Sequence, residues 1–363
     1  MDKRQQWSMR LYRPGEEDSI RALFELSMDK DLSRARWNWL YRDNHTGVFL
    51  IGLAEGEDGN LAGQCALLPV RMKVGDDTCL GAQSLDAVVH PAYRSQGIFT
   101  RLAAYTYETA AGMGVPLIYG FPNKNSHHLL AHRLDRVDLW DRPPVYVRIL
   151  DVEAVLRKRL GDGLAPRAAV PLGRAALRLL GPRGDRTLPT GCELVPVDRF
   201  DARLDALWAS ASAEFQIAVV RDHEYLNWRY VENPEQEYTK FVLQRDGDVV
   251  GYVVLKCETK FGLKMGYVVD LLTLPGEPRL GEALVAAAVE FFEGRQMHIA
   301  SCVMLGHVSY VRSLKKNGFW LPPQWVFPQE LHCSVRSQSE SYPPGFITDP
   351  GNWYVTWGDH DVV

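Results

Sequence analysis

The pattern of apolar and polar positions along the chain predicts a mixed protein of helices and strands. Residues 15–32 carry apolar side chains at the three- and four-residue spacing of one helix face. That face would be formed by Ile20, Leu23, Phe24 and Met28. Apolar runs bounded by turn residues predict strands at 49–55, 61–74 and 83–89. We therefore expect an α/β (α+β) fold in which a sheet is flanked by helices.

The most informative stretch is QSLDAVVHPAYRSQGIF, which runs from Gln83 to Phe99. Its first half predicts a mostly buried strand, and Pro91 ends the strand because proline has no N–H to donate. A polar turn from Arg94 to Gly97 then leads into a helix over 98–113. A glycine turn at a helix N-terminus points several backbone N–H groups into one space, which favours a phosphate. The stretch therefore predicts an anion-binding loop, with an ordinary strand–turn–helix connection as the alternative.

A second strand and helix follow this loop. Residues 116–121 predict a buried strand, and a short helix is expected from His127 to Leu134. Asn125 and Ser126 are suited to cap that helix.

The motif Arg94-x-x-Gly97-x-Phe99 resembles the acyl-CoA pyrophosphate loop of the GNAT (Gcn-related) acyltransferases, Arg/Gln-x-x-Gly-x-Gly/Ala. Phe99 departs from the small residue that is usual there. The order of the predicted elements over residues 7–148 is similar to the GNAT order as well. The resemblance implies that acetyl-CoA or another acyl-CoA binds here, with pantetheine in an opening between two strands. It implies the following cofactor-binding residues: Val88, Val89, His90, Arg94, Ser95, Gln96, Gly97, Ile98, Phe99, Thr100 and Asn125.

Acyl transfer needs a neutral amine, a polarised thioester carbonyl and a thiolate that can leave. Backbone N–H groups around Val88 to His90 are candidates for polarising the carbonyl. Asp86, His127 and His128 are candidate bases, although a structural role is the alternative for each. Adjacent helix residues point about 100° apart, so at most one of the two histidines faces the site. Leu130 stands where many GNAT members have a tyrosine that protonates the thiolate.

The second half of the chain repeats features of the first. Asn38-Trp39-x-Tyr41 recurs as Asn227-Trp228-x-Tyr230, an offset of 189 residues. Three further correspondences have offsets of 188, 184 and 183 residues: Gly63 with Gly251, Asp86 with Asp270, and Asp135 with Gly318. The repeat predicts two tandem GNAT-like domains, each a mixed, mostly antiparallel sheet flanked by helices. We place them at residues 1–150 and 191–335.

The two copies differ at the turn that would bind the cofactor. Pro278 stands where the first copy has Arg94, and Glu277 and Glu282 would repel a pyrophosphate. We therefore expect acyl-CoA in the first domain and a degenerate second copy. A basic linker is expected over 151–190, either as a solvated connector or as a contact for substrate phosphates. The aromatic tail over 336–363 is expected to dock on one of the domains.

Composition and charge limit the class of protein and the cellular compartment that we expect. The chain has 363 residues, of which 46% are hydrophobic and 24% charged, so a soluble globular protein with a sizeable core is expected. A net charge of −4 gives no reason to expect nucleic-acid binding, and no apolar run is long enough for a membrane span. The start of the chain lacks a signal-peptide core, and the six cysteines are scattered without a CxxC pair. These features predict a cytoplasmic protein without a metal site, and they leave the oligomeric state open.

The predicted function is transfer of an acyl group from acyl-CoA to a primary amine of a small molecule. Tandem GNAT proteins of this kind resemble bacterial enzymes that acylate nucleotide-linked amino sugars. Another amine, such as an aminoglycoside, a polyamine or a peptide terminus, is the alternative acceptor. A non-catalytic acyl-CoA sensor is the alternative from a different functional class.

Overall fold

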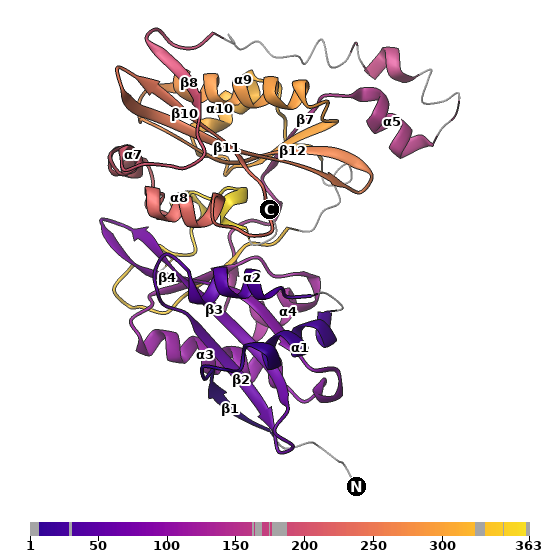
Figure 1. Cartoon of the computed structure of the whole chain (residues 1–363), viewed down its shortest axis with the longest axis vertical. Coiled ribbons are helices and arrows are strands. Elements are labelled where there is room, and N and C mark those ends of the chain that lie inside the picture. Colours follow the sequence, from indigo (N-terminus) through magenta and orange to yellow (C-terminus); the bar gives the residue numbers. More distant parts are fainter. Residues whose placement is uncertain are drawn as a thin grey trace. The chain divides into compact units, whose positions relative to one another are not determined.

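The computed structural model describes residues 7–28, 31–161, 163, 169–173, 175, 187–323, 331–343 and 345–360. The chain forms two compact units, and each contains a sheet flanked by helices (Figure 1). The first unit holds the described residues of 1–141, 232–235 and 331–352. The second holds those of 142–231, 236–329 and 353–363. The predicted fold class, mixed α and β with two such sheets, is confirmed.

The sheet of the first unit runs in the order β1-β2-β3-β4-β5-β14-β6. Its strands are β1 (Trp7–Leu11), β2 (Leu50–Gly56), β3 (Leu61–Val74), β4 (Asp77–Val89), β5 (Leu117–Gly120), β14 (Ser334–Ser337) and β6 (Val137–Asp138). Neighbouring strands in this order are antiparallel, except that β4 and β5 are parallel. The predicted mostly antiparallel sheet is therefore present.

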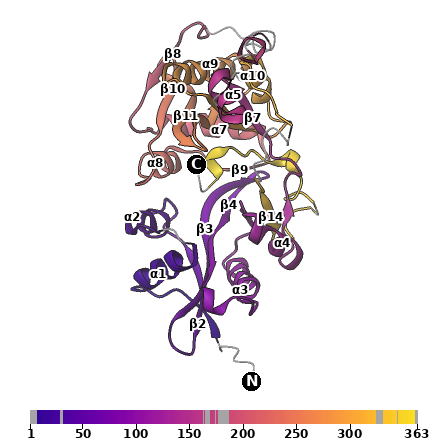
Figure 2. The ribbon, with the colours of Figure 1, turned by 90° about the vertical axis from the view of Figure 1, so that its right-hand side faces the viewer.

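Helices cover both faces of this sheet, as Figure 2 shows. One face carries α1 (Glu17–Met28), α2 (Arg34–Trp37) and the short π-helix η1 (Asn38–Arg42). The other carries α3 (Ile98–Gly112) and α4 (Lys124–Arg133). The predicted core face of α1 is confirmed for Ile20, Leu23 and Phe24, which are buried. Met28, the last residue of α1, is exposed and so does not belong to the predicted core face.

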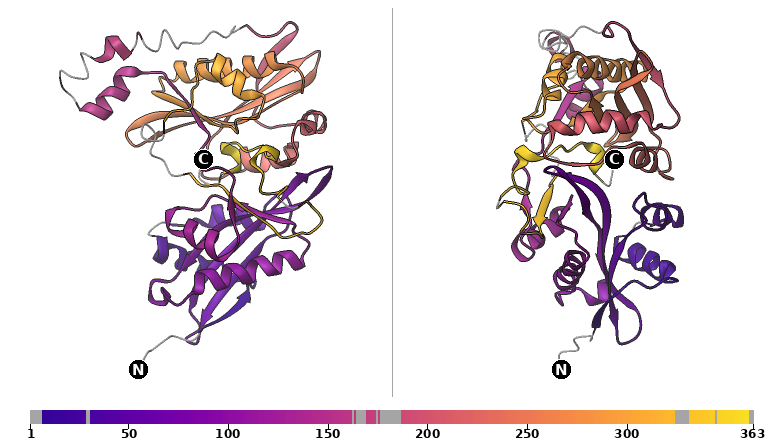
Figure 3. Two further views of the ribbon diagram at one scale, coloured as in Figure 1. Left: turned by 180° about the vertical axis from the view of Figure 1, so that it is seen from behind. Right: turned by 90° about the vertical axis from the view of Figure 1, so that its left-hand side faces the viewer.

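The sheet of the second unit runs in the order β7-β13-β12-β11-β10-β8. Its strands are β7 (Val145–Ile149), β13 (Ile299–Val303), β12 (Leu263–Thr273), β11 (Asp248–Lys260), β10 (Thr239–Arg245) and β8 (Cys192–Pro196). Figure 3 shows helices on both faces of this sheet. They are α7 (Arg203–Ala211) and α8 (His223–Tyr230) on one face, and α9 (Pro278–Gly294) and α10 (Tyr310–Lys316) on the other. As in the first unit, the strands are antiparallel except for one parallel pair, β12 with β13.

β7 and β14 lie in a different sheet from the one that the expected boundaries at 150 and 335 imply. β7 pairs with β13 in the second sheet, with Val147 opposite Ser301. β14 pairs with β5 in the first sheet, with Val335 opposite Tyr119. A strand satisfies its backbone hydrogen bonds on any available sheet edge, and neither edge has to be near in sequence. The structure therefore moves both boundaries, to Asp141 and to the region before β14.

The described residues of the expected linker belong to the second unit, and the expected tail is divided between the two units. Residues 152–160 form α5 (Val152–Leu160), which holds Arg157, Lys158 and Arg159. The other linker arginines, Arg167, Arg174, Arg178, Arg183 and Arg186, lie outside the described residues. Residues 331–352 belong to the first unit, whereas Trp353, Tyr354 and Trp357 are buried in the second.

Residues matched by the internal repeat occupy similar places in the two units. A Cβ on Gly63 would lie 3.0 Å from Ile98 of α3, and one on Gly251 would lie 3.1 Å from Leu284 of α9. Each glycine therefore lets its helix approach the sheet closely. Asp135 and Gly318 both have positive φ, 52° and 79°. Within the described part of the chain, no helix is both long and apolar enough to cross a membrane.

Candidate functional site

The loop between β4 and α3 is the predicted cofactor site. After β4, a short 3-10 helix, η2 (Pro91–Tyr93), leads to Arg94 in an extended conformation. Ser95 and Gly97 then take left-handed conformations, with φ of 64° and 78°. Gly97 is the residue just before the helix, which begins at Ile98 as predicted. Two left-handed residues within three positions turn the backbone sharply, and glycine bears this conformation at little cost.

This turn leaves a row of backbone donors open. The first hydrogen bond of α3 runs from the N–H of Arg101 to the carbonyl of Gly97, at 3.2 Å. Within the described residues, the N–H groups of Ser95, Gln96, Gly97, Ile98, Phe99 and Thr100 donate to no backbone carbonyl, and α3 has no side-chain cap. Such a row at the N-terminus of a 15-residue helix attracts a phosphate through the N–H groups and the helix dipole.

The space over the loop is open. A Cβ on Gly97 would have no heavy atom within 4 Å, and Ser95 is exposed. The loop is anchored to the β2–β3 turn, because the buried Tyr93 donates a 3.0 Å hydrogen bond to Asp58 in that turn. Arg94 is exposed, and one of its guanidinium N–H groups donates to the Ser27 carbonyl at 3.1 Å, at the C-terminal end of α1. The loop is therefore accessible, anchored and cationic on one side.

Strands β4 and β5 separate beside this loop. They pair at Ala82 with Ile118 and at Gln83 with Tyr119, and β4 then continues to Val89. The N–H of His90 donates to the Ala62 carbonyl of β3 at 3.0 Å, so His90 cannot polarise a substrate through that group, contrary to the prediction. Successive N–H groups of a strand point to opposite sides. The N–H of Val89 therefore points away from β3, toward the side where β5 has left the pairing.

Asp86 lies on β4, and its carboxylate accepts a 2.7 Å hydrogen bond from the hydroxyl of Tyr41 in η1. Its own backbone is left-handed, with φ of 48°, at a bulge in the β3–β4 pairing. The pKa of Tyr41 is raised, first by burial and then by the Asp86 carboxylate. In the second unit, Asp270 likewise accepts a 3.0 Å hydrogen bond from Tyr230.

The structure separates the two candidate histidines. α4 begins at Lys124 rather than at His127, and its cap is Asn123, which accepts from the N–H groups of Asn125 and Ser126. The predicted cap at Asn125 and Ser126 is therefore wrong, and the side chain of Asn125 is exposed. His127 is half-buried, and its Nε2 lies 2.6 Å from Asp138 Oδ2. His128 is exposed beside His132, and Asp86 belongs to the separate group around Tyr41.

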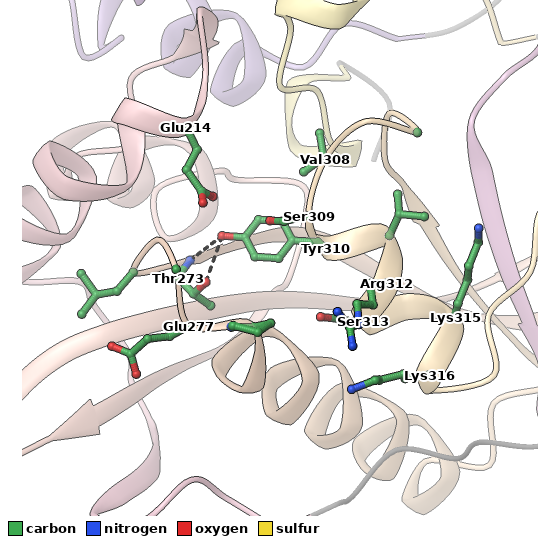
Figure 4. A pocket seen from close by; sticks show the side chains of 15 residues that line it. Glu214, Thr273, Glu277, Val308, Ser309, Tyr310, Arg312, Ser313, Lys315 and Lys316 are labelled. Atoms are coloured by element: carbon green, nitrogen blue, oxygen red, sulfur yellow. Dashed lines mark hydrogen bonds between the residues drawn. The ribbon is translucent and has the colours of Figure 1, made fainter.

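The second unit has a cavity of about 720 Å³ at the position that corresponds to this loop (Figure 4). It lies where β12 ends, α9 begins and α10 starts, and sequence reasoning did not predict it. Tyr310 closes one side and accepts a 2.8 Å hydrogen bond from the N–H of Thr273. Arg312 and Lys315 line it as exposed cations, whereas Glu214 and Glu277 line it as acids.

The helix N-terminus in this cavity is less suited to a phosphate than the first loop. Glu277 stands just before α9 and forms an ion pair with Arg245 at 2.7 Å, which lowers the pKa of Glu277 and keeps it charged. Pro278 is the first helical residue and supplies no N–H. The cavity therefore presents mixed charge, whereas the loop of the first unit presents N–H donors and Arg94.

Residues 8–128 match the family model of the acetyltransferase (GNAT) domain. No curated protein matches the chain in sequence. The family match covers the loop, α3 and the start of α4, and it supports an acyl-CoA-dependent N-acyltransferase.

Solved structures share the fold over most of the chain. A probable N-acyltransferase from Enterococcus faecalis is 12% identical, with a TM-score of 0.61 over 92% of this chain and 73% of that one. A GCN5-related N-acetyltransferase from Anabaena variabilis is 10% identical, with a TM-score of 0.63 over the same shares. Saccharomyces cerevisiae N-myristoyltransferase with bound myristoyl-CoA is 13% identical, with a TM-score of 0.54 over 92% of this chain and 84% of that one. The likeness is one of fold, because all three identities are low.

Proposed function

We propose that the first unit binds acyl-CoA at the loop from Arg94 to Thr100 and transfers the acyl group to a primary amine. The single observation that carries this proposal is the open row of N–H donors from Ser95 to Thr100. The pyrophosphate lies on these donors, with Arg94 beside it. The pantetheine arm follows the opening where β5 leaves β4 after Gln83.

The reaction then needs a donor at the thioester carbonyl. The amine attacks the carbonyl carbon and the oxygen gains negative charge. The carbonyl then re-forms, the C–S bond breaks to release CoA as a thiolate, and the nitrogen loses a proton to water, from which the thiolate is protonated. The N–H of Val89 points into the opening and is the donor we assign to this oxygen. A thiol with an ordinary pKa near 8.5 leaves without strong assistance, so a tyrosine in the place of Leu130 is not required.

The structure bears differently on the three candidate bases. Asp86 is engaged by Tyr41, and the same pair recurs in the second unit, which favours a positioning role. His128 is exposed beside His132. His127 has the Asp138 carboxylate at its ring nitrogen, so each of the three candidates is either engaged by a neighbouring side chain or exposed, and we assign the base to none of them.

The acceptor that we propose is a nucleotide-linked amino sugar, the acceptor class that the resemblance of the sequence to bacterial amino-sugar acyltransferases implies. Aminoglycosides, polyamines and peptide termini are the competing acceptors. The six cysteines are free thiols, which suits an enzyme of the reducing cytoplasm.

The proposal is tested by incubating the full-length protein with acyl-CoAs of increasing chain length and a panel of these amines. Free CoA thiol is followed together with the mass of the acylated product. Product formed from one amine class identifies the acceptor. Tight acyl-CoA binding without acylation of any amine would contradict the enzyme and favour the sensor.

A further inference from the structure

Three potential metal ligands converge in the first unit. They are His127 on α4, Asp138 on β6 and His332 just before β14. One ligand atom of each residue lies within 4.8 Å of those of the other two. The rings of His127 and His332 are stacked, with centroids 3.7 Å apart and planes at 16°. The three side chains thus form one compact cluster.

The sheet register explains why these residues meet although 205 positions separate the two histidines. β6 and β14 are antiparallel, with Asp138 opposite Ser334. The N–H of Leu139 donates to the Cys333 carbonyl at 2.8 Å, so the pairing continues toward His332. Side chains alternate along a strand, and therefore Asp138 and His332 lie on the same face of this ribbon. α4 brings His127 to that face.

Hydrogen bonds satisfy the Asp138 carboxylate of this cluster only in part. Oδ2 of Asp138 lies 2.6 Å from His127 Nε2, whereas Oδ1 is buried and has no hydrogen-bond partner among the described residues. A buried carboxylate oxygen without a donor is costly, and a bound cation removes that cost. All three residues are half-buried, so the site is shielded yet reachable from solvent.

We propose that His127, Asp138 and His332 bind one divalent transition-metal ion. Two imidazoles and one carboxylate are a ligand set that suits Zn²⁺, whereas Ca²⁺ and Mg²⁺ prefer oxygen ligands alone. Three protein ligands leave a coordination position for water. The rings of His127 and His332 must turn from their stacked arrangement so that their lone pairs converge on the ion.

The ion would fasten the segment before β14 to α4, and so would tie a distant part of the sequence into the first unit. A metal ion on His127 would also replace the hydrogen bond between His127 and Asp138, and a metal-bound imidazole cannot serve as a base. Metal binding does not depend on acyl transfer, so the two proposals can be tested separately.

The test uses the full-length protein, freed of metal with a chelator and titrated with ZnCl₂ in a calorimeter. One equivalent is expected to bind. His332→Ala and Asp138→Asn are each expected to weaken zinc binding by at least about tenfold. Asp138→Asn keeps the shape of the side chain and serves if His332→Ala fails to fold. Circular dichroism checks the fold of every variant.

The matched control is the double variant His128→Ala/His132→Ala. These two histidines are exposed on the same helix, four residues apart, with ring centroids at 4.3 Å. The control is expected to bind zinc like the wild type. Loss of binding in this control with retention in His332→Ala, or no zinc binding by the wild type, would overturn the proposal. Co²⁺ titration adds a check on the ligands, because a strong thiolate charge-transfer band would show cysteine ligation and likewise overturn it.

Discussion

The hydroxyl of Tyr41 donates a 2.7 Å hydrogen bond to the carboxylate of Asp86. Tyr41 belongs to a helical turn and Asp86 to a strand of the central sheet, so the bond ties two layers of the first unit. Asp86 has a φ of 48°, a conformation that residues other than glycine seldom adopt. Tyr230 makes the corresponding bond to Asp270 at 3.0 Å in the second unit. The Tyr–Asp pair is present in both units, although the β4–α3 loop and the β12–α9 loop differ. The pair therefore points to a structural role.

We predict that Tyr41→Phe and Asp86→Asn each lower the free energy of unfolding by about 1–3 kcal/mol, since each removes a hydrogen bond to a charged group. The double variant should cost little more than either single variant, because both remove the same bond. Urea denaturation measures all three. The pH profile of kcat/KM should keep its shape in both single variants. A far greater loss of kcat in Asp86→Asn than in Tyr41→Phe would contradict a positioning role and make Asp86 the base.

Gly97→Glu should abolish cofactor binding. The new carboxylate would project into the open space above the loop, where the pyrophosphate is expected. Like charges a few ångströms apart near a surface repel by a few kcal/mol, so calorimetry should show acyl-CoA affinity reduced at least about a hundredfold.

The control for this variant is Gly75→Glu, at the opposite end of β4. Gly75 also has positive φ, 64°, and a Cβ added there would have no heavy atom within 4 Å, so the two variants carry similar backbone strain. Acyl-CoA should bind normally to Gly75→Glu. Equal affinity of both variants would place the cofactor elsewhere.

The ion pair inside the second unit should be essential for stability. Arg221 is fully buried and bonds to Asp270 at 3.1 Å and to Asp359 at 2.8 Å. Arg221→Met would leave two buried carboxylates without their cation, and we expect a loss of about 3–5 kcal/mol.

The exposed pair of Arg203 with Asp201, at 2.8 Å, supplies the comparison. Arg203→Met should cost less than about 1 kcal/mol, because water screens that pair. Thermal and urea unfolding of both variants measure the difference. Similar losses in the two variants would show that the buried pair contributes no more than a surface pair.

Acid should weaken the first unit through His45. Burial, with a contribution from Arg71, lowers the pKa of His45 to about 4 from its ordinary value of 6.5. Between these values the unfolded chain binds a proton that the folded protein does not, so stability falls as the pH drops from about 6.5 to about 4. At pH 5 the loss attributable to His45 should be about 2 kcal/mol relative to pH 7. His45→Gln should remove that component of the pH dependence. Urea denaturation at pH 7 and pH 5 measures it, and the prediction is wrong if the free energy of unfolding changes between the two pH values as much in His45→Gln as in the wild type.

Local features of the first unit could be predicted from sequence because short-range sterics determine them. Pro91 cannot continue a strand, Gly97 bears the left-handed turn, and the helix begins at Ile98 as predicted. The repeated motifs also located Tyr41 and Tyr230 in similar places, since each motif carries its own helical turn. The end of α1 was harder to predict: apolar spacing placed Met28 on the core face, but the helix ends there and its side chain is exposed.

Only the tertiary structure decided which backbone groups remain free and which distant residues meet. The N–H of His90 donates to the Ala62 carbonyl, and that hydrogen bond depends on the register of β3 and β4. β7 and β14 pair in sheets far from their neighbours in sequence, because a strand can pair with any open row of backbone hydrogen-bonding groups. The cluster of His127, Asp138 and His332 exists for the same reason: no local pattern links residues 205 positions apart, and the insertion of β14 into the first sheet brings them together.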